Sequence, residues 1–171
     1  MYRQTYVKID NNTLTNNVKE IIKYYPNYKY YIGVVKANAY GHGMYIINDL
    51  IKGGVNYLAT SSLEEAIAVR EYNKNIPVLC LEPINLSFID EVISHNITIT
   101  IESLSYLKEL IKLNKKEKLT IHLKLDTGMS RLGFTDPVSL TEAYNLINNT
   151  KNLYLEGIYT HLATSGLNDI Y

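Results

Sequence analysis

Cysteine is almost absent from this 171-residue sequence, which contains only Cys80. A lone cysteine excludes an intramolecular disulfide framework and a cysteine-rich zinc site, and it fits a reducing compartment. Because Cys80 follows the apolar residues Val78 and Leu79, we expect it to be a small buried side chain without chemistry. We predict no metal site.

An excess of charge of one sign is also missing. The chain has 17 lysines and arginines and 17 aspartates and glutamates, so its formal net charge at pH 7 is zero. Such a chain produces no net field that would attract nucleic acid or an anionic membrane. We therefore expect a small-molecule substrate, with neither a nucleic acid nor a membrane as partner.

Long hydrophobic runs are the third absence. No stretch of 18 apolar residues occurs, and the N-terminal MYRQTYVKID has no apolar segment of the kind found in secretory signals. The sequence thus predicts neither a membrane span nor an export signal, and it favours a soluble, cytoplasmic protein.

What the sequence does contain is an alternation of short apolar runs and helical-period stretches, with a period of roughly 20–25 residues. The length is that of one domain with a single core. The predicted strands are Tyr30–Val35, Tyr57–Ala59, Val78–Leu81, Ile97–Ile101, Leu119–Leu125 and Leu153–Tyr159. The predicted helices are Leu14–Tyr24, Gly43–Lys52, Leu63–Tyr72, Leu86–Ser94, Leu104–Leu113 and Val138–Ile147. Caps are expected at Ser61 or Ser62, at Ser103 and at Asp136 before Pro137.

Strands that alternate with single helices pair in parallel through right-handed crossovers. Both a barrel and an open doubly wound sheet satisfy this pattern. An open nucleotide-binding sheet more often carries a glycine-rich phosphate turn, and neither G-x-G-x-x-G nor G-x-x-x-x-G-K-[ST] occurs. We therefore predict an α/β fold of the (β/α)8 TIM-barrel type, incomplete because only about six β/α units are visible.

Reactive side chains cluster at the predicted carboxyl ends of the strands. They are Lys36 after the first strand, Glu82 after the third, Lys124, Asp126 and Arg131 at the fifth, and His161 after the sixth. Ligands of parallel α/β folds bind at this end of the strands. A lysine such as Lys36, flanked by apolar residues at an inner rim, is partly desolvated, which favours the neutral amine that forms Schiff bases. On local sequence alone, a lysine that extends its charged end to solvent is an equally good interpretation.

Three segments carry a resemblance to a known family. The string VVKANAYGHG from Val34 to Gly43 resembles the pyridoxal 5'-phosphate (PLP) attachment motif of alanine racemases. HLKLDTGMSRLGF, from His122 to Phe134, resembles the second signature of that family, and GIYTHLAT, from Gly157 to Thr164, is similar to a third. The three occur in order over essentially the whole chain, so the resemblance implies a PLP-dependent enzyme of fold type III.

The resemblance also implies residue roles. Lys36 would bind PLP through a Schiff base and act as one of two catalytic bases, and Tyr40 would contact the cofactor phosphate. Arg131 would contact the phenolic oxygen of PLP and help to hold the substrate carboxylate. His161 would support the arginine that faces the pyridine nitrogen, an arginine expected from later strands.

Lys124 matches a lysine that is often carbamylated in this family. The charges agree with that assignment, because an ammonium beside Arg131 would repel the guanidinium, whereas a carbamate anion would attract and position it. His122 shares a strand face with Lys124, and we assign it no chemistry.

The family's second base is a tyrosine from the C-terminal β-domain of the partner subunit in a homodimer. None of the 16 tyrosines lies in the matching motif, and the chain stops after Leu167–Tyr171. We therefore expect residues 11–171 to form a partial barrel without the last strands and the C-terminal domain. Residues 1–10 would form a segment that packs on that domain. A chain with one base is expected not to racemise alanine alone.

The function implied is interconversion of L- and D-alanine for the D-alanine of cell-wall peptidoglycan, with PLP as cofactor. Three alternatives remain open. One is a serine racemase of the same fold. Another is a non-catalytic PLP-binding barrel of the kind linked to cofactor homeostasis, although its lysine motif does not read KANAYGHG. The last is an interaction fragment without activity.

Overall fold

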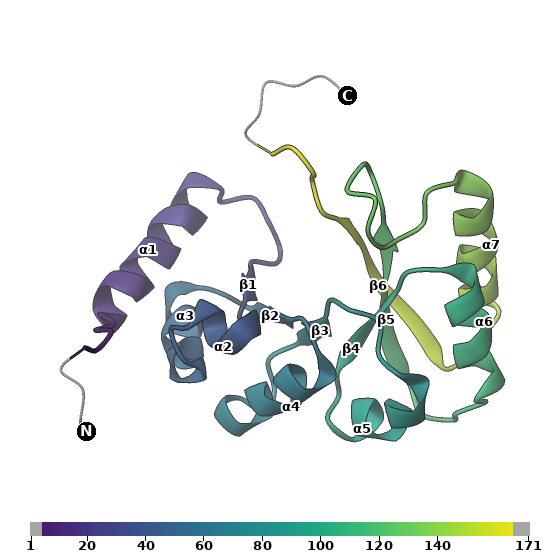
Figure 1. Cartoon of the computed structure of the whole chain (residues 1–171), viewed down its shortest axis with the longest axis horizontal. Helices are drawn as coiled ribbons and strands as arrows, with labels where there is room; N and C mark the ends of the chain where they lie inside the picture. The colour runs from purple at the N-terminus through teal and green to yellow at the C-terminus, as the bar shows by residue number, and fades with distance from the viewer. Residues whose placement is uncertain (1–4, 166–171) are drawn as a thin grey trace. The chain divides into compact units, whose positions relative to one another are not determined.

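The structure is a computed structural model that describes residues 5–165 (Figure 1). Helices and strands alternate along the described chain, as the sequence predicts. The chain divides into two compact units between Leu79 and Cys80. Of the segment expected at residues 1–10, residues 1–4 lie outside the described part, as does the chain end at Leu167–Tyr171.

The first unit contains two parallel strands and the start of a third. Its elements are α1 (Asn11–Tyr24), β1 (Ile32–Val34), α2 (Lys36–Tyr40), the 3-10 helix η1 (Met44–Ile46), α3 (Ile47–Gly53), β2 (Tyr57–Thr60) and α4 (Leu63–Tyr72), followed by the start of β3 (Val78–Cys80). β1 pairs in parallel with β2, and the N–H of Leu58 in β2 donates to the carbonyl of Pro77 at 2.9 Å, just before β3. Strand order within the unit therefore follows the sequence.

Packing in this unit depends on small residues at close contacts. Helix α1 begins three residues earlier than the sequence predicts, because Asp10 caps it by accepting the N–H of Thr13 at 2.9 Å. The helix packs against α3, where a Cβ on Gly53 would lie only 2.6 Å from the Cβ of Val18 (Figure 1). Every residue of β2 is buried.

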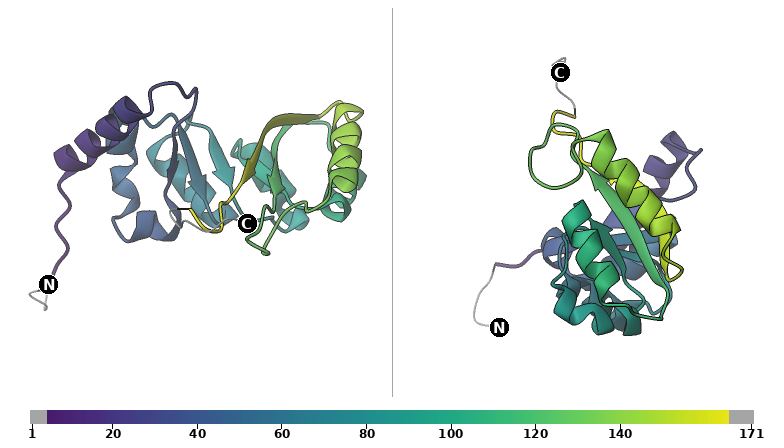
Figure 2. Two further views of the ribbon diagram at one scale, coloured as in Figure 1. Left: turned by 90° about the horizontal axis from the view of Figure 1, so that it is seen from above. Right: turned by 90° about the vertical axis from the view of Figure 1, so that its right-hand side faces the viewer.

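The second unit is a run of parallel strands covered by helices. It contains the end of β3, the 3-10 helix η2 (Leu86–Phe88), α5 (Ile89–Ser94), β4 (Thr98–Ile101), α6 (Leu104–Lys112), β5 (Leu119–Leu125), α7 (Pro137–Asn148) and β6 (Leu153–Thr160). β4 pairs with β5 and β5 pairs with β6, both in parallel. Helices α6 and α7 lie side by side (Figures 1 and 2), and α6 contacts β4 whereas α7 contacts β6.

Helix starts and the alternation of side chains in β5 agree with the sequence. Ser62, Ser103 and Asp136 each accept a backbone N–H at the start of α4, α6 and α7. In β5, Ile121 and Leu123 are fully buried, and the alternate residues His122 and Lys124 share the opposite face. Tyr159 of β6 lies near both side chains on that face.

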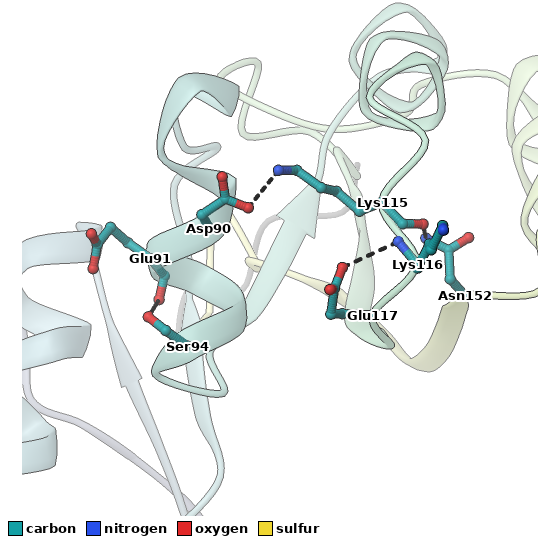
Figure 3. Close-up of polar contacts among 7 residues, drawn as sticks. All are labelled: Asp90, Glu91, Ser94, Lys115, Lys116, Glu117 and Asn152. Atoms are coloured by element: carbon teal, nitrogen blue, oxygen red, sulfur yellow. Dashed lines mark hydrogen bonds and ion pairs between the residues drawn. The ribbon is translucent and has the colours of Figure 1, made fainter.

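Polar contacts also join segments at the amino ends of β5 and β6. Lys115, in the loop before β5, forms an ion pair with Asp90 of α5 (Figure 3). The amide of Asn152, just before β6, donates to the carbonyl of Lys115 at 2.8 Å. In barrels of this type, residues at the amino ends of the strands contribute to stability, and the chemistry lies at the opposite ends.

Candidate active site

Lys36 comes directly after the residues of the first strand that pair with β2. The N–H of Val35 still donates to the carbonyl of Ala59 at 2.8 Å, so Lys36 is the first residue beyond the ladder. Its alternate neighbours Ile32 and Val34 are 45% and 40% exposed, whereas Val35 is buried. By alternation, the half-buried Lys36 continues the open face of β1 rather than the packed one.

The backbone after Lys36 makes a left-handed helical turn. Ala37, Asn38, Ala39 and Tyr40 all have φ between 50° and 53°. For residues other than glycine this conformation costs roughly 1–2 kcal/mol each and is seldom repeated. Strain of this kind persists only where surrounding contacts determine it, and it concentrates at functional sites.

Hydrogen bonds within the motif close this turn. The N–H groups of Gly41 and Gly43 donate to the carbonyl of Asn38 at 3.1 and 2.9 Å. The side-chain oxygen of Asn38 accepts the N–H of Met44 at 3.1 Å. Gly41 and Gly43 have φ of 83° and 92°, as expected for a tight turn, so the helix predicted from Gly43 begins instead as the short η1.

Tyr40 ends the left-handed turn, and its side chain is 61% exposed. It also lines a groove of about 480 Å³ in the first unit, together with β1 and helix α1. The phenol is therefore accessible, as a residue that contacts a cofactor phosphate must be.

Glu65, which the sequence analysis did not single out, reaches this turn from the first turn of α4. One carboxylate oxygen accepts the N–H of Ala37 at 2.6 Å, and the other accepts the N–H and the hydroxyl of Ser61 at 2.9 and 2.8 Å. Burial raises the pKa of Glu65, but hydrogen bonds from Ser61, Ala37 and Ser62 outweigh it and hold the pKa below its ordinary value. The available signal was the capping-box spacing from Ser62 to Glu65.

In the second unit, the loop after β5 folds around Asp126. Its carboxylate accepts the N–H groups of Gly128, Ser130 and Arg131 at 3.0, 2.9 and 2.6 Å. The loop then returns to its own strand, where the N–H of Phe134 donates to the carbonyl of Lys124 at 2.8 Å. The backbone of Arg131 is thereby fixed, and its side chain is exposed.

Lys124 is only 5% exposed, on the face of β5 that carries the polar groups. Its ammonium donates to the carbonyl of Leu125 at 2.8 Å and lies 5.3 Å from the ring centroid of Tyr159. Burial lowers the pKa of Lys124, Asp126 raises it, and the charge of Arg131 lowers it, with a net decrease. The charge of Arg131 thus disfavours the ammonium form of Lys124, but less than burial does.

Tyr159, in β6, connects three strands of the second unit and was not predicted as a site residue. Its hydroxyl donates to the carbonyl of Leu81 at 3.1 Å. The hydroxyl of Thr100 lies 2.8 Å from it and donates to the carbonyl of Cys80 at 2.7 Å. Burial raises the pKa of Tyr159 to about 12, although the hydrogen bond with Thr100 acts in the opposite direction. The phenol therefore stays protonated at neutral pH. The sequence placed Tyr159 two residues after Gly157, on the same face of the predicted strand, and gave no stronger signal for a role.

His161 is the first residue after β6, and it is exposed. Its neighbour Thr160 contacts the loop after β5, because the Thr160 hydroxyl donates to the carbonyl of Leu125 at 3.0 Å and lies 2.8 Å from that of Thr127. The structure thus places Lys36 and Tyr40 in the first unit, and Lys124, Arg131 and His161 in the second.

Other polar side chains fit structural roles. His122 is buried and lies 3.1 Å from the carboxylate of Glu156. Cys80 is fully buried, as predicted. Among residues 5–165 there is no cluster of three metal-ligating side chains, and no helix in that range is long and apolar enough to cross a membrane.

Comparison with known sequences identifies one family. Residues 9–170 match the family described as "Alanine racemase, N-terminal domain". The chain is 39% identical over 170 residues to alanine racemase 2 of Caldanaerobacter subterraneus subsp. tengcongensis, covering 98% of this chain and 44% of the relative. It is 39% identical over 167 residues to the alanine racemase of Staphylococcus saprophyticus, covering 95% and 43%. The chain therefore spans less than half the length of these relatives.

Solved structures agree. The alanine racemase from E. faecalis superposes with a TM-score of 0.88 at 31% identity, covering 94% of this chain and 44% of that one. The Bacillus anthracis alanine racemase with bound L-Ala-P gives a TM-score of 0.89 at 30% identity, covering 99% and 44%. A histidine racemase from Leuconostoc mesenteroides, at 24% identity and a TM-score of 0.85, shares the fold. The predicted partial barrel, equivalent to the N-terminal barrel of these enzymes, is confirmed.

Proposed function

Because the chain belongs to the alanine racemase family, we propose that it is the lysine-bearing barrel portion of a PLP-dependent amino-acid racemase that interconverts L- and D-alanine. The observation that carries this proposal is the placement of Lys36. It is half-buried on the open face of β1, immediately before a left-handed turn that no ordinary strand-to-helix connection requires.

The side chains present fit PLP. Lys36 offers an amine for a covalent bond, the exposed phenol of Tyr40 offers a donor for a phosphate, and the exposed guanidinium of Arg131 offers a fork for the phenolic oxygen or a carboxylate. His161 is exposed beside the loop that carries Arg131 and would support an arginine near the pyridine nitrogen. When bound, PLP supplies an electron sink for the negative charge that develops at the substrate α-carbon.

Racemisation requires a base on each face of the substrate α-carbon. We assign one to Nζ of Lys36, which takes the α-proton from one enantiomer and returns a proton in the reverse direction. The second base would be a tyrosine of the partner subunit in a homodimer. On this proposal, the 171 residues alone would exchange the α-proton without producing the other enantiomer.

Lys124 is proposed to carry a carbamate in the assembled enzyme. Its lowered pKa supports this, because only the neutral amine reacts with carbon dioxide. The new anion would convert the repulsion from Arg131 into attraction. Growth in 13C-bicarbonate should give one carbamate resonance that the K124A variant lacks and the K118A variant keeps. A resonance that persists in K124A would refute the assignment.

Alanine is the proposed substrate because alanine racemases are the similar sequences at 34–39% identity. The histidine racemase shows that the fold alone does not select a substrate. The proposed role is supply of D-alanine for peptidoglycan. The proposed location is the cytoplasm, which the single free thiol of Cys80 supports because it fits a reducing compartment.

Borohydride reduction of the chain with PLP, followed by peptide mass mapping, tests the proposal. We expect the pyridoxyl group on Lys36, loss of the adduct in K36A, and no change in K52A, which alters an exposed lysine of the same unit. An adduct distributed over surface lysines and unaffected by K36A would contradict the proposal.

A further inference from the structure

The contact between Glu65 and Ala37 joins two segments that are 28 residues apart. Ala37 is the residue after Lys36 and the first with a left-handed conformation, at φ 50° and ψ 51°. Its N–H belongs to the peptide group that links it to Lys36. A hydrogen bond to this N–H therefore restrains the orientation of the peptide plane that includes the Cα of Lys36, the atom that carries the side chain.

Helix capping does not account for this contact. Helix α4 is capped by Ser62, whose hydroxyl accepts the N–H of Glu65 at 3.4 Å. In a capping box the glutamate would return to the N–H of the cap residue. The N–H of Ser62 contributes to the lowered pKa of Glu65 less than those of Ser61 and Ala37 do, and a capping box would explain only that contribution. It does not explain why one oxygen of Glu65 accepts from Ser61 and the other accepts the N–H of Ala37 at 2.6 Å, because both residues lie outside helix α4.

The charge state of Glu65 suits these partners. Two N–H groups and one hydroxyl point at its two oxygens, and an ionised carboxylate is the side chain that accepts at both ends and donates at neither. Hydrogen bonds donated to a charged acceptor are also shorter and stronger than those donated to a neutral one. A glutamine at this position would present an amide N–H group to one of the two donor sets.

We propose that Glu65 is a positioning residue for Lys36: by accepting the N–H of Ala37, it holds the left-handed turn in place and aims the Lys36 amine at the cofactor. This inference rests on the proposed function, because it assigns to Glu65 the orientation of the lysine that binds PLP. Glu65 acts through the backbone and touches neither substrate nor cofactor.

The variants E65Q and E64Q form a matched pair. Both remove one negative charge from the first turn of α4, but Glu64 is exposed and Glu65 makes the contacts described. In E65Q the amide oxygen should stay with the two donors of Ser61, which leaves the amide N–H2 facing the N–H of Ala37. The cap by Ser62 remains, so E65Q should fold. A cooperative urea unfolding transition in both variants would verify this.

Two measurements then separate positioning from a merely structural role. The first needs no cofactor and follows the Ala37 amide by NMR. In the wild type its proton should be protected from exchange and should shift as Glu65 titrates, below the ordinary carboxyl pKa. In E65Q protection should fall about tenfold, as for a lost hydrogen bond. Ala37 protection that is equal in E65Q and E64Q would overturn the proposal.

The second measurement is the fraction of Lys36 trapped by borohydride at subsaturating PLP. We expect E65Q to lower the apparent affinity for covalent attachment about tenfold or more, because small displacements of reacting groups are costly, and E64Q to match the wild type. Loss of Ala37 protection with unchanged trapping would overturn the positioning role and leave a structural contact. If borohydride never traps PLP on Lys36 of the wild type, while the Ala37 amide still shifts as Glu65 titrates, the proposed function is refuted instead.

Discussion

Two carboxylates hold the backbone next to a lysine that we propose to be functional, one in each unit, and they do so in opposite ways. Asp126 lies two residues after Lys124 and accepts N–H groups two to five residues further along the chain. Glu65 lies 28 residues from Ala37 and reaches a turn that has no carboxylate of its own. The first arrangement is local and can be encoded by a short motif, whereas the second requires a folded unit.

The strain in the two regions differs accordingly. The loop after β5 has left-handed conformations mainly at glycines, Gly128 and Gly133, with Ser130 as the exception. The turn after β1 places alanine, asparagine and tyrosine in that region, where the conformation is costly for residues with a Cβ. The β1 turn therefore depends on outside contacts more than the β5 loop does.

The largest effect is expected at Gly133. A Cβ there would lie 2.7 Å from three backbone atoms of residues 124–126, and φ is 123°. We predict that G133A lowers the free energy of unfolding by about 3 kcal/mol or more, because it combines a backbone clash with a disfavoured conformation. The control is G128A, at φ 126° with nothing within 4 Å, which should cost about 1 kcal/mol. Urea titrations that give equal losses would show that the loop does not need its close return to β5.

A smaller effect is expected at Tyr159. The Y159F variant removes the donor to the carbonyl of Leu81 and the contact with the hydroxyl of Thr100, which keeps its hydrogen bond to Cys80. This should lower the free energy of unfolding by about 1–2 kcal/mol. Tyr154 lies in the same strand and is 48% exposed, so Y154F should change it by less than about 0.5 kcal/mol. If both variants unfold at the same urea concentration, the network around Tyr159 does not stabilise this unit.

The smallest effect concerns pH and Asp126. Hydrogen bonds from the N–H groups of Ser130, Arg131 and Gly128 hold the pKa of Asp126 below its ordinary value. Its folded-state pKa is thus lower than in the unfolded chain, so its stabilisation is complete above the unfolded value of about 3.9 and is lost as pH falls through the folded value.

We therefore predict that D126N destabilises the protein at pH 7 and reduces the loss of stability on acidification below about pH 4. Urea midpoints measured at pH 7 and again below about pH 4 check this. The control is E109Q, which changes an exposed residue of α6. An acid response that is identical in D126N and E109Q would mean that the loop does not depend on the ionised carboxylate.

Much of the fold follows from local patterns in the sequence. Alternating strands and helices, the caps at Ser62, Ser103 and Asp136, and the position of Lys36 at a strand end were predicted and are observed. These features depend on patterns within a few residues. The left-handed turn after Lys36 was not predicted, because alanine and tyrosine give no local signal for it.

The same reasoning explains why Glu65 and Tyr159 were missed. Glu65 reads as an ordinary residue in the first turn of a helix until β1 is placed beside β2. Tyr159 reads as one of many tyrosines, and its role depends on pairing that brings β6 to residues 81 and 100. Contacts over such separations come from topology rather than from local propensity.

Exchange of the α-proton tests the central claim most directly. The chain is incubated with PLP and, in separate reactions, with L-alanine or D-alanine in deuterium oxide, and deuterium at the α-carbon and formation of the opposite enantiomer are both followed. For the enantiomer whose α-proton faces Lys36, we predict deuterium incorporation that exceeds the rate with PLP alone, is abolished in K36A and is kept in K52A, with no opposite enantiomer beyond the control. Exchange that is indifferent to K36A would contradict the assignment of Lys36. Formation of D-alanine at about 1 s⁻¹ or faster, within the usual range of enzymes, would contradict the claim that these residues supply only one base.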